Sequence, residues 1–409
     1  MSLFNFEYTE PIFLSLHTLP FGKYILILTR YRPTMQKSNF RRILKKHFLI
    51  WVALSINTFV TAQALTFPAT DISISSHGRT VLDRSGNIEL ISSASFVGFC
   101  FEGDSCTVLL QNIATPGNYN YVALEIDGEY SGRLKVDGNE MRNFSITSKR
   151  KLSPWHTFRI YKATEASNGI VLFHGVKAQK LKQLEVKYTT RIEFIGNSIT
   201  CGMGNDMQLI PCGSNKWYDQ HNAYWSYASI TAREIGADYM LSSISGAGIY
   251  RNWNSDGPTV PQQYKSAYLN ADSLKMFDFK AFEPDFVVVA LGTNDLSSGD
   301  GSRQRQAFDS VAFINEYIRF IGTLYACHPN ARIILLTSPM IADSRSELLL
   351  MCLQSVKAKA NLQYPAYKGI DLFRFVEVPS TGCTGHPTIE EHKMMASQLI
   401  PFLRNRINK

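Results

Sequence analysis

The chain has 409 residues, of which 45% are hydrophobic and 19% are charged, and its formal net charge is +8. This composition is that of a globular protein, and the length suffices for two domains. Residues 1–64 contain eight Lys or Arg and two Glu, so that segment contributes +6 and the rest of the chain +2. A nearly neutral body excludes nucleic-acid binding through a basic surface.

The N-terminal segment is predicted to direct export. From Met35 a basic stretch is followed by an apolar run at 48–60 and by Ala62-Gln63-Ala64, a signal-peptidase pattern. The apolar run has about 13 residues, fewer than the roughly 20 needed to span a bilayer. We predict a signal peptide at 35–64 and a secreted or periplasmic mature protein without membrane association. Residues 1–34 are interpreted as lying upstream of the true start at Met35.

Residues 68–187 are predicted to form an all-β sandwich. Short runs rich in alternating or β-branched residues occur at 88–91, 106–110, 121–126, 158–161 and 169–173. Turn signals rich in Gly, Asn and Asp separate them, as at 84–87, 115–118 and 136–139. Many short strands at regular spacing favour a sandwich.

From residue 188 to 409 the pattern changes to alternating strands and helices. We predict strands at 192–195, 239–244, 286–291 and 332–337, and helices at 224–237, 308–325 and 389–407. Thr388 and Glu391 have the spacing of a capping box at the start of the last helix. The alternation predicts an α/β domain with a mostly parallel sheet between two helical layers. Functional sites on such sheets lie beyond the carboxyl ends of the strands.

Three short segments with candidate site residues follow predicted strands at that edge. In Gly-Asn-Ser, Ser198 would expose its hydroxyl in a tight turn beside free N–H groups, or would merely cap a helix. In the 243–248 segment, Gly246 or Gly248 could present a backbone N–H to a ligand, or the segment could be a flexible turn. In Gly-Thr-Asn-Asp, Asn294 could stabilise an oxyanion or form an Asx turn.

A candidate general base precedes the last helix. His386 lies in a Gly-rich loop at 382–386, and Pro387 restricts its backbone towards an extended conformation. We expect this loop to return to the edge of the sheet that carries Ser198. His392, one turn into the helix, is interpreted as structural because His is often partly buried without a catalytic role.

In this order the four segments resemble the conserved blocks of the SGNH (GDSL-type) hydrolase superfamily, over residues 191–409. The resemblance implies that Ser198 is the nucleophile and His386 its general base. It also implies an oxyanion hole formed by the N–H groups of Ser198 and Gly246 and by the side chain of Asn294. Gly248 competes with Gly246 because the Ser-Gly-Ala-Gly run allows either. No metal or other cofactor is implied.

Further strings are similar to carbohydrate esterase family two. They lie at 196–205, 250–253, 382–383 and 77–79. The resemblance implies a jelly-roll N-terminal domain and a serine esterase that removes acetyl groups from plant polysaccharides such as xylan and glucomannan. The partner would be an acetylated polysaccharide or oligosaccharide. Two alternatives remain: an SGNH lipase or thioesterase acting on other acyl esters, and a glycan-binding protein that has lost catalysis.

The chain departs from the family pattern beside the base. Cys383 stands three residues before His386, where an acid is usual, and Thr384 stands two before it, where some relatives have Asp. We therefore expect a backbone carbonyl to orient the imidazole. Gly385 replaces an aromatic residue that often helps to hold the sugar, so substrate preference stays open. Asn197 stands where Asp is common, a change that relatives share.

Seven cysteines follow the leader, and their spacing matches no zinc motif. Proximity in sequence favours the pairs Cys100–Cys106 and Cys201–Cys212, although connectivity cannot be read from sequence. The odd count leaves at least one thiol unpaired.

Overall fold

The computed structural model describes residues 12–19, 23–30, 64–150, 153–272, 274–376 and 378–408. Strands β1 (Ile12–Leu19) and β2 (Lys23–Arg30) pair antiparallel within a unit separate from Gln63–Lys409. Apart from Ala64, the signal peptide expected at 35–64 lies outside the described residues and stays a prediction. No helix in the described part of the chain is long and apolar enough to cross a membrane.

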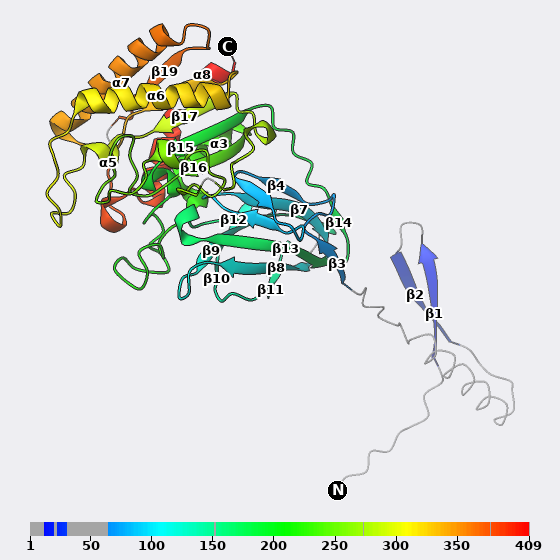
Figure 1. Cartoon of the computed structure of the whole chain (residues 1–409). Coiled ribbons are helices and arrows are strands. Elements are labelled where there is room, and N and C mark those ends of the chain that lie inside the picture. Colours follow the sequence, from blue (N-terminus) through cyan, green and yellow to red (C-terminus); the bar gives the residue numbers. More distant parts are fainter. Residues whose placement is uncertain are drawn as a thin grey trace. The chain divides into compact units, whose positions relative to one another are not determined.

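The first part of the larger unit is a β-sandwich, as predicted (Figure 1). One antiparallel sheet has the order β10-β9-β12-β7-β14 with β4 paired to β7, and the other has the order β11-β8-β13-β6-β5 with β3 paired to β13. The strands are β3 (Leu65–Pro68), β4 (Ser75–His77), β5 (Thr80–Leu82), β6 (Ile88–Leu90), β7 (Phe96–Glu102), β8 (Ser105–Ile113), β9 (Asn120–Ile126), β10 (Glu129–Val136), β11 (Arg142–Thr147), β12 (Trp155–Lys162), β13 (Ile170–Ala178) and β14 (Leu181–Lys182). A 3₁₀ turn, η1 (Ala166–Asn168), follows β12.

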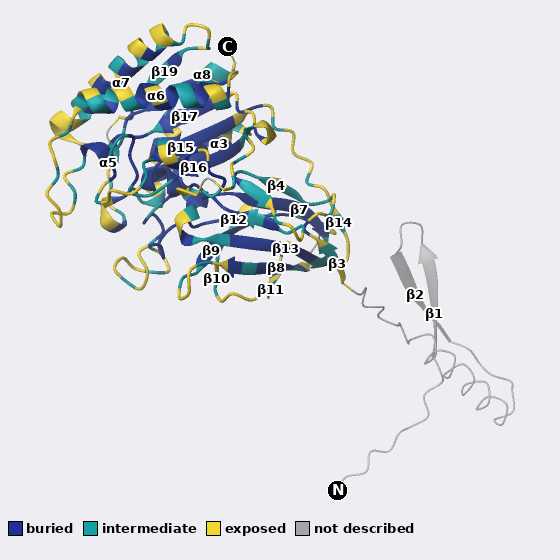
Figure 2. Ribbon diagram, in the orientation of Figure 1, coloured by how far each residue is buried: buried dark blue, intermediate teal, exposed yellow. Residues whose placement is uncertain are grey.

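One sheet of the sandwich is covered on both faces. In β9, Val122 and Leu124 belong to the core between the two sheets, whereas Tyr121 and Ala123 belong to a core shared with the second domain. Successive side chains of a strand point to opposite faces, so this alternation assigns one face to each core. The strand is therefore buried throughout (Figure 2).

The second part is an α/β domain with a parallel sheet, as predicted. Its strand order is β16-β15-β17-β18-β19. The strands are β15 (Arg191–Gly196), β16 (Asp238–Ser243), β17 (Phe286–Ala290), β18 (Arg332–Leu336) and β19 (Ile370–Phe373). The helices and 3₁₀ turns are α2 (Ser198–Cys201), η2 (Ala223–Trp225), α3 (Tyr227–Ile235), α4 (Val260–Gln263), η3 (Phe279–Ala281), α5 (Thr293–Leu296), α6 (Ser310–Cys327), α7 (Asp343–Gln363), η4 (Cys383–Gly385) and α8 (Ile389–Ile407).

Helices cover both faces of this sheet. Phe194 of β15 packs in the same core as Leu399 of α8, and the next residue, Ile195, packs in the core that contains residues of α6 and α7. The first core also contains sandwich residues, so the two domains share buried apolar side chains.

The strand order brings three loops to one edge of the sheet. Gly196, the last residue of β15, pairs with Ser243 at the end of β16 and with Ala290 at the end of β17. The first strand of the domain, β15, therefore lies between the second, β16, and the third, β17. At the carboxyl end of β15 the strand order reverses, because β16 lies on one side of it and the later strands lie on the other. Ligands of open parallel sheets bind at such a switch point.

Besides short helices and 3₁₀ turns, the long helix α7 and the strand β19 of the α/β domain were not anticipated from the sequence. Helix α7 begins after Ala342, whose side chain makes no capping hydrogen bond, so the usual start signal is missing. The helix predicted at 224–237 begins instead at Tyr227, because residues 223–225 form η2 and Ser226 caps the helix by accepting from Ala228 N–H.

A fully buried arginine joins the two domains. Arg79, from the sandwich, donates to the carbonyl oxygens of Tyr264 and Ser266 at 3.2 and 2.9 Å. Its Nη2 lies 3.7 Å from Oε1 of Glu193 on β15 and donates to Ser242 Oγ at 2.9 Å. Burial lowers the pKa of Arg79, and the Glu193 carboxylate opposes that effect. The paired charges therefore hold the start of the sandwich against β15 and β16.

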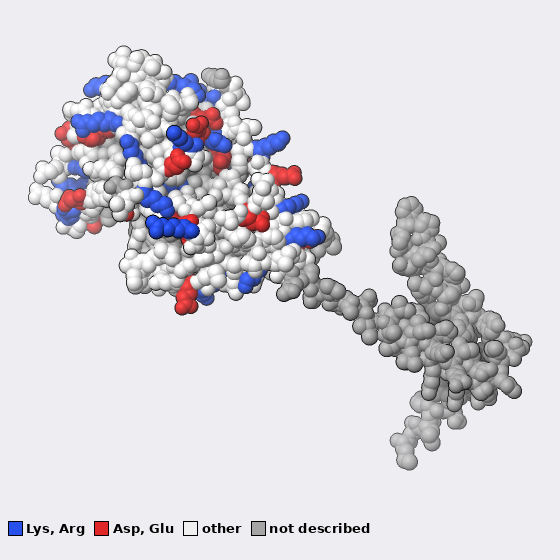
Figure 3. Space-filling model, turned by 45° about the vertical axis from the view of Figure 1, so that its right-hand side comes forward, with Lys and Arg blue, Asp and Glu red and all other residues white. Residues whose placement is uncertain are grey.

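The surface charges are mixed in sign. Figure 3 shows Lys and Arg interspersed with Asp and Glu over the face in view. This agrees with the small net charge of the chain outside its first 64 residues.

We predict that Arg79→Met lowers the free energy of unfolding by about 3–5 kcal/mol, because it removes a buried cation that faces Glu193 and leaves the carbonyl oxygens of Tyr264 and Ser266 without this donor. Urea unfolding measures the change. Arg142→Met is the control, because Arg142 pairs with Asp137 on the surface and its removal should cost less than about 1 kcal/mol. Equal losses in the two variants would contradict a structural role for the buried pair.

Candidate active site

The candidate nucleophile lies at the end of the central strand β15. Ser198 is the first residue of α2, and the Asn197 side chain caps this short helix by accepting from Ile199 N–H at 3.3 Å. A side chain at Gly196 would place its Cβ 2.1 Å from Thr200 Oγ1, so the tight turn requires glycine. Ser198 is 7% exposed.

The structure brings the candidate base to this serine. Nε2 of His386 lies 2.8 Å from Oγ of Ser198, across 188 positions of sequence. The backbone of His386 is extended, with φ −89° and ψ 159°, as expected before Pro387. In contrast, His392 is buried in α8, where its Nδ1 accepts from Tyr227 N–H at 3.1 Å, a structural contact.

Backbone contacts hold the His386 loop against the segment that follows Ser198. Cys383 N–H donates to Gly204 O at 3.0 Å, and Ile389 N–H donates to Asn205 O at 3.1 Å. A Cβ at Gly204 would lie 2.8 Å from Cys383 O, so the approach depends on glycine. These contacts fix the position of the His386 loop relative to α2.

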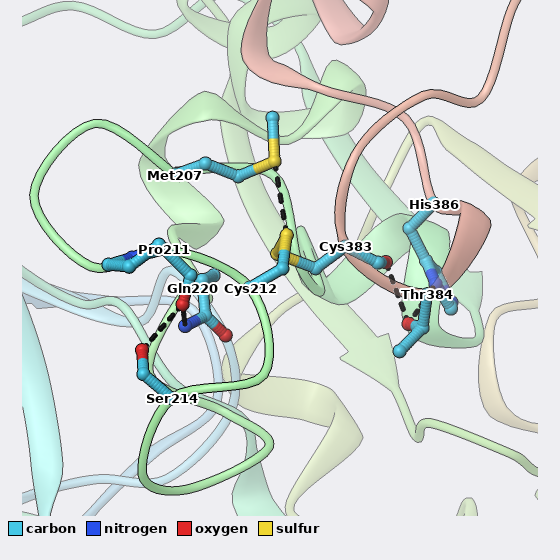
Figure 4. The surroundings of a disulfide bond; sticks show 8 residues. All are labelled: Met207, Pro211, Cys212, Ser214, Gln220, Cys383, Thr384 and His386. Carbon is cyan, nitrogen blue, oxygen red and sulfur yellow. Dashed lines mark hydrogen bonds between the residues drawn. A yellow bond between two sulfur atoms is a disulfide. The ribbon is translucent and has the colours of Figure 1, made fainter.

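A disulfide between Cys212 and Cys383 reinforces this loop (Figure 4). The pairings favoured by sequence proximity are wrong, because Cys100, Cys106 and Cys201 are free thiols. Cys100 and Cys106 lie on strands of different sheets, and the Cys201 thiol is buried among polar groups behind α2. The actual bond closes a separation of 171 residues that sequence proximity could not indicate.

Thr384 orients the imidazole. Its Oγ1 lies 3.0 Å from His386 Nδ1 and donates to Cys383 O at 2.7 Å (Figure 4). Because that hydroxyl proton is used, Oγ1 can accept from Nδ1–H, which leaves Nε2 free to accept from Ser198. We expected a backbone carbonyl in this role. The backbone of Cys383 and Thr384 does act on the imidazole, and the Thr384 hydroxyl, which was not anticipated, lies at hydrogen-bond distance from Nδ1. Thr384 adopts a left-handed backbone with φ 54° to do so.

The surroundings of His386 favour its neutral form. Burial is the main cause that lowers its pKa to about 4, and the nearby His221 lowers it further. Hydrogen bonding to the backbone of Cys383 and Thr384 and the charge of Glu165 act in the opposite direction. At neutral pH the imidazole is therefore unprotonated and able to accept a proton.

The geometry distinguishes the two candidate glycines. Gly248 N–H donates to Asn252 Oδ1 at 3.1 Å, so it is used within the protein. Gly246 has φ 75°, its N–H has no acceptor among the described residues, and the space beside its Cα is open. Gly246 is thus the better candidate for an oxyanion donor.

The third candidate donor is anchored to the same turn. Asn294 Nδ2 donates one proton to Ala247 O at 2.7 Å, which leaves its second N–H for another acceptor. The adjacent Asp295 is buried and accepts from Ile249 N–H and Tyr250 N–H, so it holds the loop after Gly246 in place.

Two residues that contribute to the candidate site were not anticipated from the sequence. Thr384 drew attention only because it stands where some relatives have Asp. Its position two residues before His386 could have suggested a contact between its hydroxyl and the imidazole. Glu165 belongs to the sandwich domain, and no local pattern indicated it. Among the described residues, no group of three or more His, Cys, Asp or Glu could hold a metal ion.

Comparisons with known proteins match both domains. Residues 194–376 match the GDSL-like Lipase/Acylhydrolase family, and residues 76–186 match the Carbohydrate esterase 2 N-terminal family. The α/β domain is therefore that of a GDSL-type (SGNH) hydrolase. With its N-terminal domain, the chain belongs to the carbohydrate esterase family two group of these hydrolases.

Individual relatives agree with this assignment. "Cellulase/esterase CelE" of Acetivibrio thermocellus is 32% identical over 70% of this chain, and the match spans about a third (35%) of that relative's length. An "Acetylxylan esterase / glucomannan deacetylase" of Cellvibrio japonicus is 27% identical over 61% of this chain and 69% of its own. A solved family two carbohydrate esterase from Clostridium thermocellum, in complex with cellohexaose, is 26% identical with a TM-score of 0.71, covering 82% of this chain and 99% of that one.

We predict that ester hydrolysis by this protein persists into acid solution. The base acts only when unprotonated, and its pKa is lowered to about 4, so kcat/KM should be constant above about pH 5 and fall as pH drops through about 4. A pH profile with an aryl ester measures this, and stability at each pH is checked by preincubation. An acid limb near the ordinary His value of about 6.5 would contradict it.

We also predict that Thr384→Val lowers kcat by about 10–100-fold, because the imidazole loses the acceptor that selects its tautomer. Thr384→Ser, which retains the hydroxyl, should stay within about threefold of the parent. Valine has the shape of threonine, so the cost of placing a β-branched residue in the left-handed conformation at position 384 is the same in both. Equal activity in the two variants would assign the orienting role to the backbone alone.

Proposed function

We propose that this protein is a serine esterase that removes acetyl groups from plant polysaccharides such as xylan and glucomannan. The observation that carries the proposal is the 2.8 Å contact between Ser198 Oγ and His386 Nε2 at the edge of the sheet where Gly246 and Asn294 present donors. The N-terminal domain and the named activities of the relatives support the carbohydrate as substrate.

The arrangement supports an acyl-enzyme mechanism. His386 accepts the Ser198 proton as the oxygen attacks the acetyl carbonyl, and Thr384 holds the ring while it is charged. The N–H groups of Ser198 and Gly246 and the Asn294 amide stabilise the oxyanion. His386 then protonates the departing sugar hydroxyl, and water repeats the sequence on the acetyl-enzyme. None of these steps requires a metal or other cofactor.

Two exposed indoles provide apolar surfaces for a sugar near this site. Trp253 is 41% exposed, and its backbone N–H donates to the carbonyl of Gly246 at 2.8 Å. Trp217 is 50% exposed and lies in the segment that the Cys212–Cys383 bond ties to the His386 loop. Exposed large apolar side chains often mark ligand-binding surfaces. Both indoles could stack on pyranose rings, a role for which Gly385 provides no aromatic side chain.

Export is part of the proposal. The signal-like sequence before Ala64 and the disulfide at Cys383 both suit an oxidising compartment, where polysaccharide is the available substrate.

Acetate release by the purified protein tests the proposed function. With acetylated xylan, glucomannan or mannose acetates, we expect hydrolysis that Ser198→Ala reduces by at least about 10³-fold. Ser297→Ala is the control, because this partly buried serine follows α5 and its hydroxyl accepts from Gly299 N–H. The control should keep the activity of the parent.

The same assays separate the alternatives. Faster hydrolysis of aryl octanoate than of aryl acetate would favour a lipase or thioesterase of the superfamily. No acetate release from any substrate, together with retained polysaccharide binding, would favour a glycan-binding protein without catalysis.

A further inference from the structure

A buried carboxylate of the sandwich domain lies directly behind the candidate active site. Glu165 follows β12, caps the turn η1, and is 1% exposed. Its Oε2 accepts from Ser245 N–H at 2.8 Å and from the Cys201 thiol at 3.3 Å. Ser245 immediately precedes Gly246, and Cys201 ends the short helix that begins with Ser198. One side chain of the first domain therefore contacts both segments of the second domain that supply backbone oxyanion donors.

Charged and polar groups surround this carboxylate. Nε2 of His221 faces Glu165 Oε1 at 3.7 Å, and Lys162 Nζ donates to the backbone carbonyl of Glu165 at 2.6 Å. Burial opposes ionisation, but the His221 imidazole and the Ser245 N–H hold the pKa of the Glu165 carboxyl below its ordinary value. Burial lowers the pKa of Lys162 to about 7. Glu165 is therefore a charged acceptor, which forms stronger hydrogen bonds than a neutral one.

The first half of the turn depends on this contact, because Glu165 is the acceptor of the Ser245 N–H. The bonds of Asn294 to Ala247 O and of Asp295 to the N–H groups of Ile249 and Tyr250 hold only the residues that follow Gly246. Gly246 has a left-handed backbone, and no atom lies within 4 Å of the position its Cβ would occupy. The neighbouring bonds are Ala247 N–H to Ile244 O at 3.3 Å and Trp253 N–H to Gly246 O at 2.8 Å. Without Glu165, the partly buried Ser245 N–H would lose its acceptor, and the peptide that carries the Gly246 N–H would lose a restraint on its N-terminal side.

We propose that Glu165 is a positioning residue for the oxyanion hole, so that the sandwich domain forms part of the catalytic apparatus. The inference rests on the proposed function, because it assigns Gly246 N–H to the oxyanion. Glu165 touches neither substrate nor Ser198 Oγ; it acts by fixing the Ser245–Gly246 turn against α2. A second bond crosses the domain boundary nearby, from Ala223 N–H to Ala163 O at 3.0 Å, and keeps the two surfaces in register.

The test compares variants of Glu165 with a matched interdomain carboxylate. Glu125 is buried on β9, and its Oε2 accepts from the Tyr224 hydroxyl of the second domain at 3.0 Å, so Glu125→Gln weakens the interface away from the turn. Against an aryl acetate we expect Glu165→Ala to lower kcat by about 10²-fold with KM within about threefold. Glu165→Gln keeps an acceptor and should lose about tenfold, and Glu125→Gln should stay within about twofold.

Hydrogen–deuterium exchange provides a readout that does not require turnover. Glu165→Ala should raise the exchange rate of the peptide that contains Ser245 and Gly246, whereas Glu125→Gln should leave it unchanged. If the parent protein releases no acetate but Glu165→Ala still exchanges faster at this peptide, the proposed function is contradicted and the positioning of the turn by Glu165 is supported.

The inference is overturned if Glu165→Ala matches Glu125→Gln in kcat, or if the loss appears in KM instead. Unchanged exchange at the turn also overturns it. If Glu165→Ala does not fold, the comparison of Glu165→Gln with Glu125→Gln decides by the same criteria.

Discussion

The site depends on the contact between the loop at 382–388 and the segment that follows Ser198. That loop is distant in sequence from Ser198, the candidate nucleophile, and a strand order alone would not bring a hydroxyl and an imidazole to 2.8 Å. Backbone hydrogen bonds to Gly204 and Asn205 and the Cys212–Cys383 bond supply the missing restraint. The conformational entropy of ordering the loop is thus offset by contacts outside the reacting groups.

The absence of an acid beside His386 in sequence changes how the base is supported. A hydroxyl relay through Thr384 selects the tautomer, but a neutral hydroxyl stabilises an imidazolium less than a carboxylate would. The negative charge of Glu165 acts on His386 from the other domain and raises its pKa against the effect of burial. The support that one carboxylate provides in a triad is here spread over the Thr384 hydroxyl, the backbone of Cys383 and Thr384 and, as the smallest of these contributions to the pKa, the charge of Glu165.

The sequence predicted most of the fold and indicated the two side chains, Ser198 and His386, that the fold brings together. Strand–helix alternation and Gly-Asn-Ser after a strand are local signals, so β15, α2 and the edge of the sheet that carries them could be anticipated. The Cys212–Cys383 pairing and the contacts of Glu165 depend on residues brought together only by folding. Helix α7 was missed because Ala342 offers no cap. Gly246 could be preferred over Gly248 only when the acceptor of the Gly248 N–H was known.

The buried pair of Arg79 and Glu193 has a consequence for motion. Opening the two domains about the boundary would separate Arg79 from Glu193 and from its acceptors Tyr264 O, Ser266 O and Ser242 Oγ. It would also expose apolar side chains of the core that the domains share, at a cost of several kcal/mol in total. Such a hinge would therefore be rarely populated at room temperature. A long polymer would then have to bind along a surface that is already shaped, and any adjustment to different chains would come from loops and side chains.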